Sequence, residues 1–314
     1  MFTSSAQVSP HIRGNFKTSR LMLDVVIALL PAVGVGIARF GLRALGIILL
    51  SVCAAVLTEF LYCVFLKKRV TVIDASAIVT GLLLALTLPV SAPLWMPAAG
   101  SAFAILFGKL LFGGLGQNIF NPALTGRAFL MLIYPVGITR YSMGVDAASS
   151  ATPLHHMVMP SLPDESILDM FLGFCPGSIG EISALALLIG FVYLLLRKVI
   201  SWRIPVFVML SAAALSLIFS KAGTSVEWML YTLLSGGLML GAIYMATDYA
   251  TSPVTQKGQM IYGALIGALI VLFRYFGIFP EGVTYAILLS NALVWVIDRY
   301  TGPVRFGKVK GAKK

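Results

Sequence analysis

The segment D-A-A-S-S-A-T-P-L, residues 146–154, contains a hydroxyl group suited to chemistry. Thr152 precedes a proline, and the residue before a proline is pushed into extended backbone geometry, so its hydroxyl is displayed rather than tucked into a helix. The small side chains of Ser149 and Ala151 leave room for a large group to approach. The pattern therefore predicts an accessible acceptor hydroxyl at Thr152. The alternative is a turn or a helix cap built by a hydroxyl group in a polar loop.

Two amides lie close together in G-G-L-G-Q-N-I-F-N-P-A-L-T-G-R, residues 113–127. Glycines allow another group to approach the backbone closely. Asn118 and Asn121 offer the paired donors and acceptors that the edge of a flat heterocycle requires. A turn followed by a helix N-cap, built from asparagine and proline, explains the same residues equally well.

Three carboxylates occur within or at the ends of apolar segments, where a charged group is costly and usually functional. They are Asp24, Glu59 and Asp248. We expect them to influence the coupling of a cation to the function of the protein. For Asp24 and Glu59, each a few residues from the end of its segment, helix capping or contact with the membrane interface is the alternative. For Asp248 the alternative is a helix cap.

The composition shows what must position these groups. Of 314 residues, 59% are apolar and 11% are charged, against roughly 45 to 50% and 25% in a soluble domain. With a mean hydropathy of +0.94, too few polar side chains remain to cover a soluble globule, which excludes a soluble enzyme and a disordered chain. The three cysteines, Cys53, Cys63 and Cys175, are spaced for neither a disulfide framework nor a metal site, so no metal is expected.

The sequence predicts an all-α polytopic membrane protein with about ten transmembrane helices. A helix needs about 20 apolar residues to cross the bilayer, and fewer where it is broken or partnered. No cleavable signal peptide is expected before the first segment. The predicted segments are 21–38, 44–66, 75–90, 94–111, 123–138, 179–196, 204–220, 228–246, 260–276 and 283–298.

The positions of Lys and Arg predict the orientation, because cytoplasmic flanks retain basic residues. With the N-terminus inside, 18 of the 23 basic residues fall on cytoplasmic flanks, Lys109, Arg127 and Arg197 among them. We therefore expect both termini in the cytoplasm of a bacterium and the loop that carries Thr152 outside its cytoplasmic (inner) membrane. The membrane also accounts for the net charge of +11, so no nucleic-acid partner is expected.

A polar segment, 139–178, divides the chain into two halves of five predicted helices each. An odd number of helices per half places the halves in opposite orientations, which is the arrangement of an inverted repeat. The two similar stretches 79–89 and 236–253 support it. The expected regions are a cytoplasmic segment 1–20, a first half 21–138, the external loop 139–178, a second half 179–298 and a basic cytoplasmic tail 299–314.

The pattern D-x-x-[ST]-x-A-T, formed by Asp146, Ser149, Ala151 and Thr152, resembles the flavin-attachment sequence of the RnfD/NqrB family of membrane subunits. These subunits belong to the Rnf complex and to the sodium-pumping NADH:quinone oxidoreductase. The blocks S-P-H-I-R, G-G-L-G-Q-N-I-F-N-P-A-L-T-G-R and M-A-T-D-Y-A-T-S-P, from both halves, resemble the same family. The short chain favours the Rnf branch.

The resemblance implies the cofactors and partners. It implies that a flavin transferase joins FMN through its phosphate to the Thr152 hydroxyl, and that Asn118 and Asn121 contact a non-covalent riboflavin. The chain would be an electron-transfer subunit of an ion-translocating ferredoxin:NAD oxidoreductase, coupling electron transfer to Na⁺ or H⁺ movement. Its partners would be the Rnf subunits A, B, C, E and G. The chain has neither a dinucleotide fingerprint nor a ferredoxin cysteine run, so partner subunits would bind NAD and iron–sulfur clusters.

Two other functions fit parts of the sequence. An inverted repeat of five helices is also the plan of a solute transporter, and the family is thought to share its architecture with urea channels. A small-solute channel gives no role to the segment around Thr152. An NqrB-like part of a sodium-pumping quinone reductase is the nearer alternative, and it requires a quinone pocket.

Overall fold

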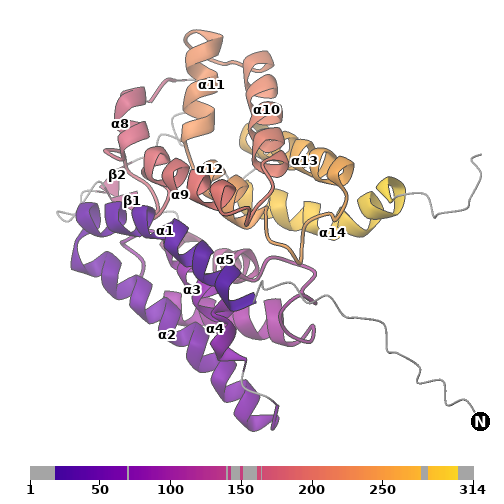
Figure 1. Ribbon diagram of the computed structural model, residues 1–314. Coiled ribbons are helices and arrows are strands. Elements are labelled where there is room, and N and C mark those ends of the chain that lie inside the picture. The colour runs from indigo at the N-terminus through magenta and orange to yellow at the C-terminus, as the bar shows by residue number, and fades with distance from the viewer. Residues whose placement is uncertain are drawn as a thin grey trace, which may run out of the picture.

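The computed structural model describes residues 18–68, 71–138, 141–142, 149–150, 161–163, 165–276 and 282–302. Within them the protein is helical, apart from two short antiparallel strands that pair Tyr141 with Ser150 and Ser142 with Ser149. In chain order the elements are α1 (Thr18–Phe40), α2 (Leu42–Phe65), η1 (Val72–Asp74), α3 (Ser76–Leu86), α4 (Trp95–Ile105), η2 (Leu106–Leu110), α5 (Pro122–Ile133), α6 (Pro135–Ile138), β1 (Tyr141–Ser142), β2 (Ser149–Ser150), α8 (Ile167–Leu172), α9 (Ala184–Leu196), α10 (Arg203–Ile218), α11 (Ser225–Leu234), α12 (Leu238–Leu240), η3 (Gly241–Met245), α13 (Gln256–Phe276) and α14 (Val283–Thr301) (Figure 1).

The apolar segments form the helices of a multi-pass membrane protein. In the described part of the chain, α1, α2 and α13 are long and apolar enough to cross a bilayer by themselves. The bent pair formed by α11 and the helix 238–245 makes a fourth candidate span. Large apolar side chains are exposed on these and other helices, among them Leu42, Leu132 and Leu196, each more than three-quarters exposed. Such an apolar outer surface suits contact with lipid rather than water.

Each of the ten predicted segments contains helix, but several helices begin, end or break where the hydropathy did not indicate. The segment 228–246 is bent by 62°, at a break between Leu234 and Leu238. Gly236 and Gly237 occupy the break with φ values of 56° and 63°, a backbone region open mainly to glycine. The segment 179–196 becomes helical only at Ala184, because the Ser183 side chain caps the helix by accepting from the Ala186 backbone N–H at 3.2 Å.

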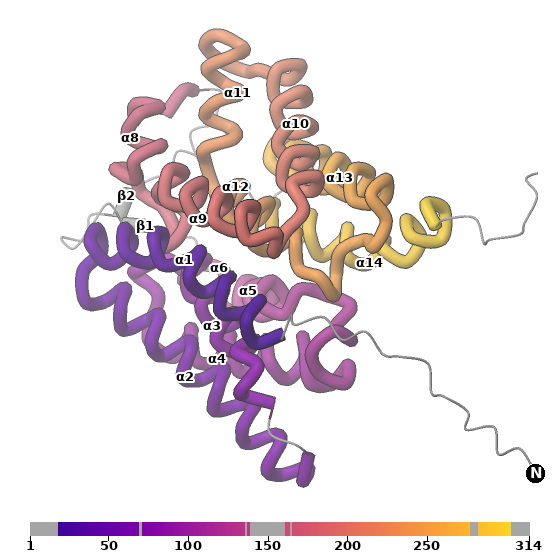
Figure 2. The backbone as a smooth tube through the Cα atoms, viewed as in Figure 1, coloured from indigo at the N-terminus to yellow at the C-terminus, as the bar shows by residue number. Residues whose placement is uncertain are grey.

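The two halves of the sequence form two groups of helices (Figures 1 and 2). Helices α1 to α5, indigo to magenta, lie together in the lower part of the view, and α9 to α14, salmon to yellow, lie above them. Helix α1 packs against α9, which joins the groups. At their crossing, a Cβ on Gly190 would clash with the Ala28 carbonyl oxygen. The hydroxyl of Tyr244 completes this junction, because it donates to that carbonyl at 3.1 Å.

Candidate functional site

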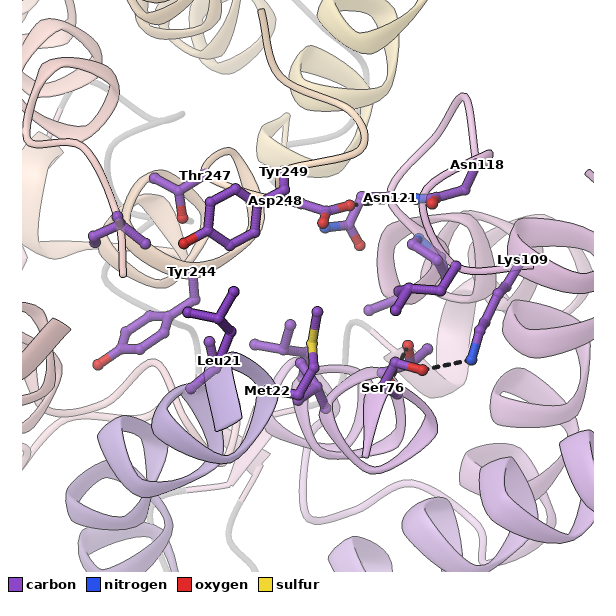
Figure 3. A pocket seen from close by; sticks show the side chains of 18 of the residues that line it. Leu21, Met22, Ser76, Lys109, Asn118, Asn121, Tyr244, Thr247, Asp248 and Tyr249 are labelled. Carbon is purple, nitrogen blue, oxygen red and sulfur yellow. Dashed lines mark hydrogen bonds between the residues drawn. The ribbon is translucent and has the colours of Figure 1, made fainter. Parts of the chain in front are cut away.

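The main cavity lies between the two groups of helices (Figure 3). It has about 750 Å³ of space not filled by protein atoms, the open solvent at its mouth included. Its walls come from the first turns of α1 and α3, from η2, from the segment 115–123 and from η3 with the residues after it. Leu21, Met22, Leu83 and Leu115 supply apolar surface, and the polar side chains converge from opposite walls.

Asn118 joins the two walls of the cavity. Its side-chain Nδ2 donates to Asp248 Oδ2 at 3.3 Å and to the Phe120 carbonyl at 3.2 Å. Among the described residues, no group donates to its Oδ1, so this oxygen remains available to a ligand in the cavity. The Asn118 residue is 5% exposed, and its position is fixed by contacts from both halves of the chain.

Asn121 lines the same cavity but uses its polar atoms within the protein. Its Oδ1 accepts from the Leu124 backbone N–H at 3.3 Å, which caps α5, and Pro122 occupies the first helical position. Its Nδ2 donates to the Met245 carbonyl at 3.0 Å, and its backbone N–H donates to Asn291 Oδ1. The helix-cap interpretation therefore holds for Asn121, whereas Asn118 presents an acceptor to the cavity.

Asp248 follows η3, in the turn that leads to α13, and lines the cavity opposite Asn118. Its removal from water raises the pKa of the carboxyl group above the ordinary value. Hydrogen bonds from the Ala250 backbone, the Asn118 and Thr251 side chains and the Tyr249 backbone oppose this rise. A carboxyl group held in this way can exchange a proton or a cation with a ligand in the cavity.

Glu59 lies behind the cavity wall in a fully buried ion pair. Lys109 Nζ lies 2.8 Å from both of its carboxylate oxygens and also donates to the Ser76 hydroxyl. Thr71 donates a further hydrogen bond to Glu59. Lys109 belongs to the π-helix η2, and Lys109 and Ser76 both line the cavity. This pair connects the charge of Glu59 to the cavity.

Asp24, on the buried face of α1, pairs with α9 instead. The Tyr193 hydroxyl donates to its Oδ1 at 2.8 Å, and Arg197 Nε lies 3.3 Å from the same oxygen. Asp24, Glu59 and Asp248 therefore have separate partners. In the described part of the chain, no three acidic, cysteine or histidine side chains are placed to bind a metal ion together.

The segment that carries the predicted attachment site is described only in part. Asp146, Ala151 and Thr152 lie outside the described residues, and Ser149 is described through its backbone in β2. Strand β2 ends at Ser150, two residues before Thr152 in the sequence. Further along the segment, the Arg39 guanidinium lies 5.2 Å from the Phe174 ring centre, which ties the residues after α8 to the end of α1.

Sequence reasoning missed two features of the interior. It counted Lys109 and Arg127 as flanking basic residues, but both are buried, at 2% and 4% exposure. Arg127 Nη1 lies 3.5 Å from Glu181 Oε1 and also donates to the Thr87 carbonyl. For Arg127 the only signal was its position shortly after an asparagine–proline helix start, which does not identify its partner.

Comparisons with known proteins extend over nearly the whole chain. Residues 5–307 match the family described as NQR2, RnfD, RnfE. The D subunit of the Na⁺-translocating ferredoxin:NAD⁺ oxidoreductase complex of Acetobacterium woodii is 45% identical, over 98% of this chain and 96% of that protein. The proton-translocating counterpart of Clostridium ljungdahlii is 42% identical, with the same coverage. The D subunit of the ion-translocating oxidoreductase complex of Stutzerimonas stutzeri is 37% identical, over 92% of each chain.

Proposed function

The chain belongs to the NQR2, RnfD, RnfE family, and from this membership we propose that it is the D subunit of an ion-translocating ferredoxin:NAD⁺ oxidoreductase complex. The observation that carries the proposal is the 45% and 42% identity to two such subunits along almost the full length of all three chains. As a membrane subunit it takes part in electron transfer within the complex. The other Rnf subunits, A, B, C, E and G, supply the sites for ferredoxin and NAD.

We propose that the helices cross the membrane ten times, as two inverted repeats of five. The pairing of helices supports this arrangement, because contacts in one half recur in the other. Helix α2 packs on α3 and α4 in the first half, and α10 packs on α11 and α13 in the second. Helices α4 and α5 correspond in the same way to α13 and α14. The bent unit α11–η3 then corresponds to α3 and crosses the membrane as one broken span. The domain boundaries are those expected from the sequence, with halves at 21–138 and 179–298.

The proposed orientation places both termini in the cytoplasm of a bacterial cell and the loop 139–178 outside the inner membrane. Three contacts between flanking residues support it, since each of these three joins positions on the same predicted side. On the cytoplasmic side Asp24 contacts Arg197, and Asp298 accepts from the Val254 backbone. On the external side Tyr231 donates to the Glu165 carbonyl.

Two flavins are proposed, at different places. FMN is attached by a flavin transferase through its phosphate to Thr152, on the strength of the motif formed with Asp146, Ser149 and Ala151. Riboflavin binds in the main cavity, where Asn118 Oδ1 and the Asp248 carboxyl group face the ring edge and Asn121 holds the wall in place. The mostly apolar lining of the cavity suits the faces of a flat heterocycle. A flavin supplies single-electron transfer, and the protein supplies its position and local charge.

The carboxylates Asp24, Glu59 and Asp248 are proposed to influence cation coupling. Asp248 faces the cavity directly, and Glu59 communicates with it through Lys109. A change of charge on a ligand in the cavity would alter the electrostatic balance of both groups. Asp24 acts at a distance from the cavity, through its contact with Arg197.

The attachment of FMN can be tested directly. The complex is purified from its native host, or the chain is coexpressed with a flavin transferase, and the denatured subunit is inspected for fluorescence and digested for mass spectrometry. We expect one FMN on the peptide that contains Thr152 and none in Thr152→Ala. Ser150→Ala, which deletes a neighbouring hydroxyl, is the matched control and should keep the FMN.

An unmodified Thr152 peptide from cells with an active transferase would reject the FMN proposal and favour a solute channel.

Riboflavin is tested separately, by extracting non-covalent flavin with mild acid from parent, Asn118→Ala and Asn121→Ala proteins. We expect Asn118→Ala to lose the flavin while the fold persists. Retention of the full amount of riboflavin in Asn118→Ala would remove Asn118 from the proposed site.

A further inference from the structure

A second, smaller cavity lies between the two groups of helices and contains charged side chains. It has about 280 Å³ of space not filled by protein atoms, open solvent included. Thr87, Leu124 and Arg127 line it from the first half, and Glu181, Gly236, Gly237 and Thr284 line it from the second. The Arg127 and Glu181 side chains are 4% and 8% exposed and lie 3.5 Å apart. A buried ion pair therefore spans this cavity from one half to the other.

Two arginines cap helices that end inside the protein. Arg127 donates to the Thr87 carbonyl at the end of α3. Arg274 donates from Nη2 to the Ser235 and Gly236 carbonyls, at 2.8 and 2.9 Å, at the end of α11. The last carbonyls of a helix lack helical partners and carry partial negative charge, so they attract cations. In transporters, such interrupted helix ends bind the transported ion. In this protein, guanidinium groups occupy the carboxyl ends of both α3 and α11.

Among the described residues at these two helix ends, positive side chains outnumber negative ones. Among the described residues that line the second cavity, Glu181 is the only acidic one. It accepts from the Ser178 hydroxyl at 2.8 Å as well as facing Arg127. Its carboxylate also packs on the helix break, because a Cβ on Gly237 would clash with its Oε1. Arg127 contacts this carboxylate, and Arg274, which caps the neighbouring helix end, is near enough to interact with it electrostatically. Both arginines remain charged at physiological pH.

A single layer of residues separates this cavity from the larger one. Asn121 lines the main cavity, Met245 lines the second, and the two residues touch through the hydrogen bond from Asn121 Nδ2 to the Met245 carbonyl. Leu124, in the first turn of α5 after Asn121, lines the second cavity. Arg127 lies beyond this contact, in the wall of the second cavity.

We propose that Arg127 and Arg274 act as tethered cations that exclude free cations from the space between the two halves, so that the resting protein does not leak Na⁺ or H⁺ along this line. A fixed positive charge in a poorly hydrated passage repels a cation strongly and is little screened by salt. Arginines block cations in this way in other selective pores. The inference rests on the membrane-spanning part of the proposed function and is independent of both flavins.

The test measures passive ion entry into liposomes that contain the whole complex, without electron donor. A trapped Na⁺-sensitive or pH-sensitive dye reports the leak under an imposed membrane potential. The variant Arg127→Gln keeps a polar side chain but removes the charge, and we expect about a tenfold or greater rise in Na⁺ entry. Arg274→Gln should act in the same direction. Arg127→Lys, which keeps the charge, should remain as tight as the parent.

Arg43→Gln is the matched control. Arg43 also donates to a backbone carbonyl, that of Ser91, but it is exposed and lies outside the cavity. Its replacement removes one positive charge without opening the second cavity, and we expect no change in ion entry. The double variant Arg127→Gln/Glu181→Gln distinguishes two roles of Arg127, repelling free cations and neutralising Glu181. If Arg127 served only to neutralise Glu181, the double variant would be tight, and the proposal would be overturned.

Parent-like ion entry in both Arg127→Gln and Arg274→Gln would also overturn the proposal. Where Arg127→Gln does not accumulate in the membrane, the double variant, which leaves no unpaired buried carboxylate, replaces it in the measurement. The flavin content of each preparation is measured in parallel. A leak with normal flavin content supports the barrier. If the variant loses a flavin but its liposomes do not leak, the barrier proposal is wrong. The loss of flavin then bears only on the proposed flavin sites.

Discussion

Lys109 places its ammonium nitrogen 2.8 Å from both carboxylate oxygens of Glu59, fifty residues earlier in the chain. The side chains are 2% and 0% exposed. The sequence alone indicated a membrane carboxylate and a separate flanking lysine. The structure makes them one neutral unit, which connects α2 to the wall of the main cavity.

Removing one member of this pair should destabilise the protein strongly. Lys109→Met leaves Glu59 charged and buried without its partner, which typically costs about 3–5 kcal/mol. The double variant Lys109→Met/Glu59→Gln should recover most of that loss, because no uncompensated charge remains. Thermal unfolding in detergent measures both variants. Equal unfolding temperatures for the single and double variants would contradict the assignment of the pair as a coupled unit.

Gly190 should tolerate no larger residue. A Cβ at this position would clash with both the Ala28 carbonyl oxygen and the Tyr244 hydroxyl, so Gly190→Ala must push α9 away from α1. Overpacking of this kind costs about 1–3 kcal/mol. Gly34→Ala is the matched control, since that glycine also lies in a helix and no atom approaches within 4 Å of its added Cβ. We expect the control to be neutral or slightly stabilising, and a neutral Gly190→Ala would argue against this close crossing.

The stability of the protein should depend on pH through Asp248. Burial raises the pKa of its carboxyl group in the folded protein above the ordinary 3.8, so the folded state holds the proton more tightly than the unfolded chain does. Lowering the pH through the interval between the unfolded-state and folded-state pKa values therefore increases the contribution of Asp248 to the stability of the folded protein. At pH values well above the raised pKa, the free energy of unfolding of the parent should be low relative to that of Asp248→Asn. As the pH falls, the free energy of unfolding of the parent should rise relative to that of the variant. Thermal unfolding of both proteins over a pH series checks this sign, and a difference independent of pH would refute it.

The proposed orientation predicts which exposed lysines face the outside. Lys221 and Lys257 are both exposed, in the turn before α11 and within the first turn of α13. With Cys53, Cys63 and Cys175 replaced by alanine, an impermeant maleimide should label Lys221→Cys in intact cells and Lys257→Cys only after permeabilisation. The native Cys175 would react slowly in any case, because burial raises the pKa of its thiol to about 12. The reverse labelling pattern would invert the topology.

The sequence by itself determined the membrane class and the presence of helix in each apolar segment. Apolar composition and helix length are local properties, so they specify helices without knowledge of the fold. The cap at Asn121 and Pro122 was also readable, because an N-cap involves only neighbouring residues. The resemblance of separate sequence blocks to one family agreed with the family match over residues 5–307.

Only the tertiary structure decided which polar groups meet. Asn118 and Asp248 lie 130 residues apart, and Arg127 and Glu181 come from different halves of the chain. Their partners depend on how α1 crosses α9 and where α11 breaks, and neither is a property of a local stretch. A buried charge must find a partner or a helix end. The sequence therefore indicated that partners were needed, whereas the packing of the two halves determined which residues supplied them.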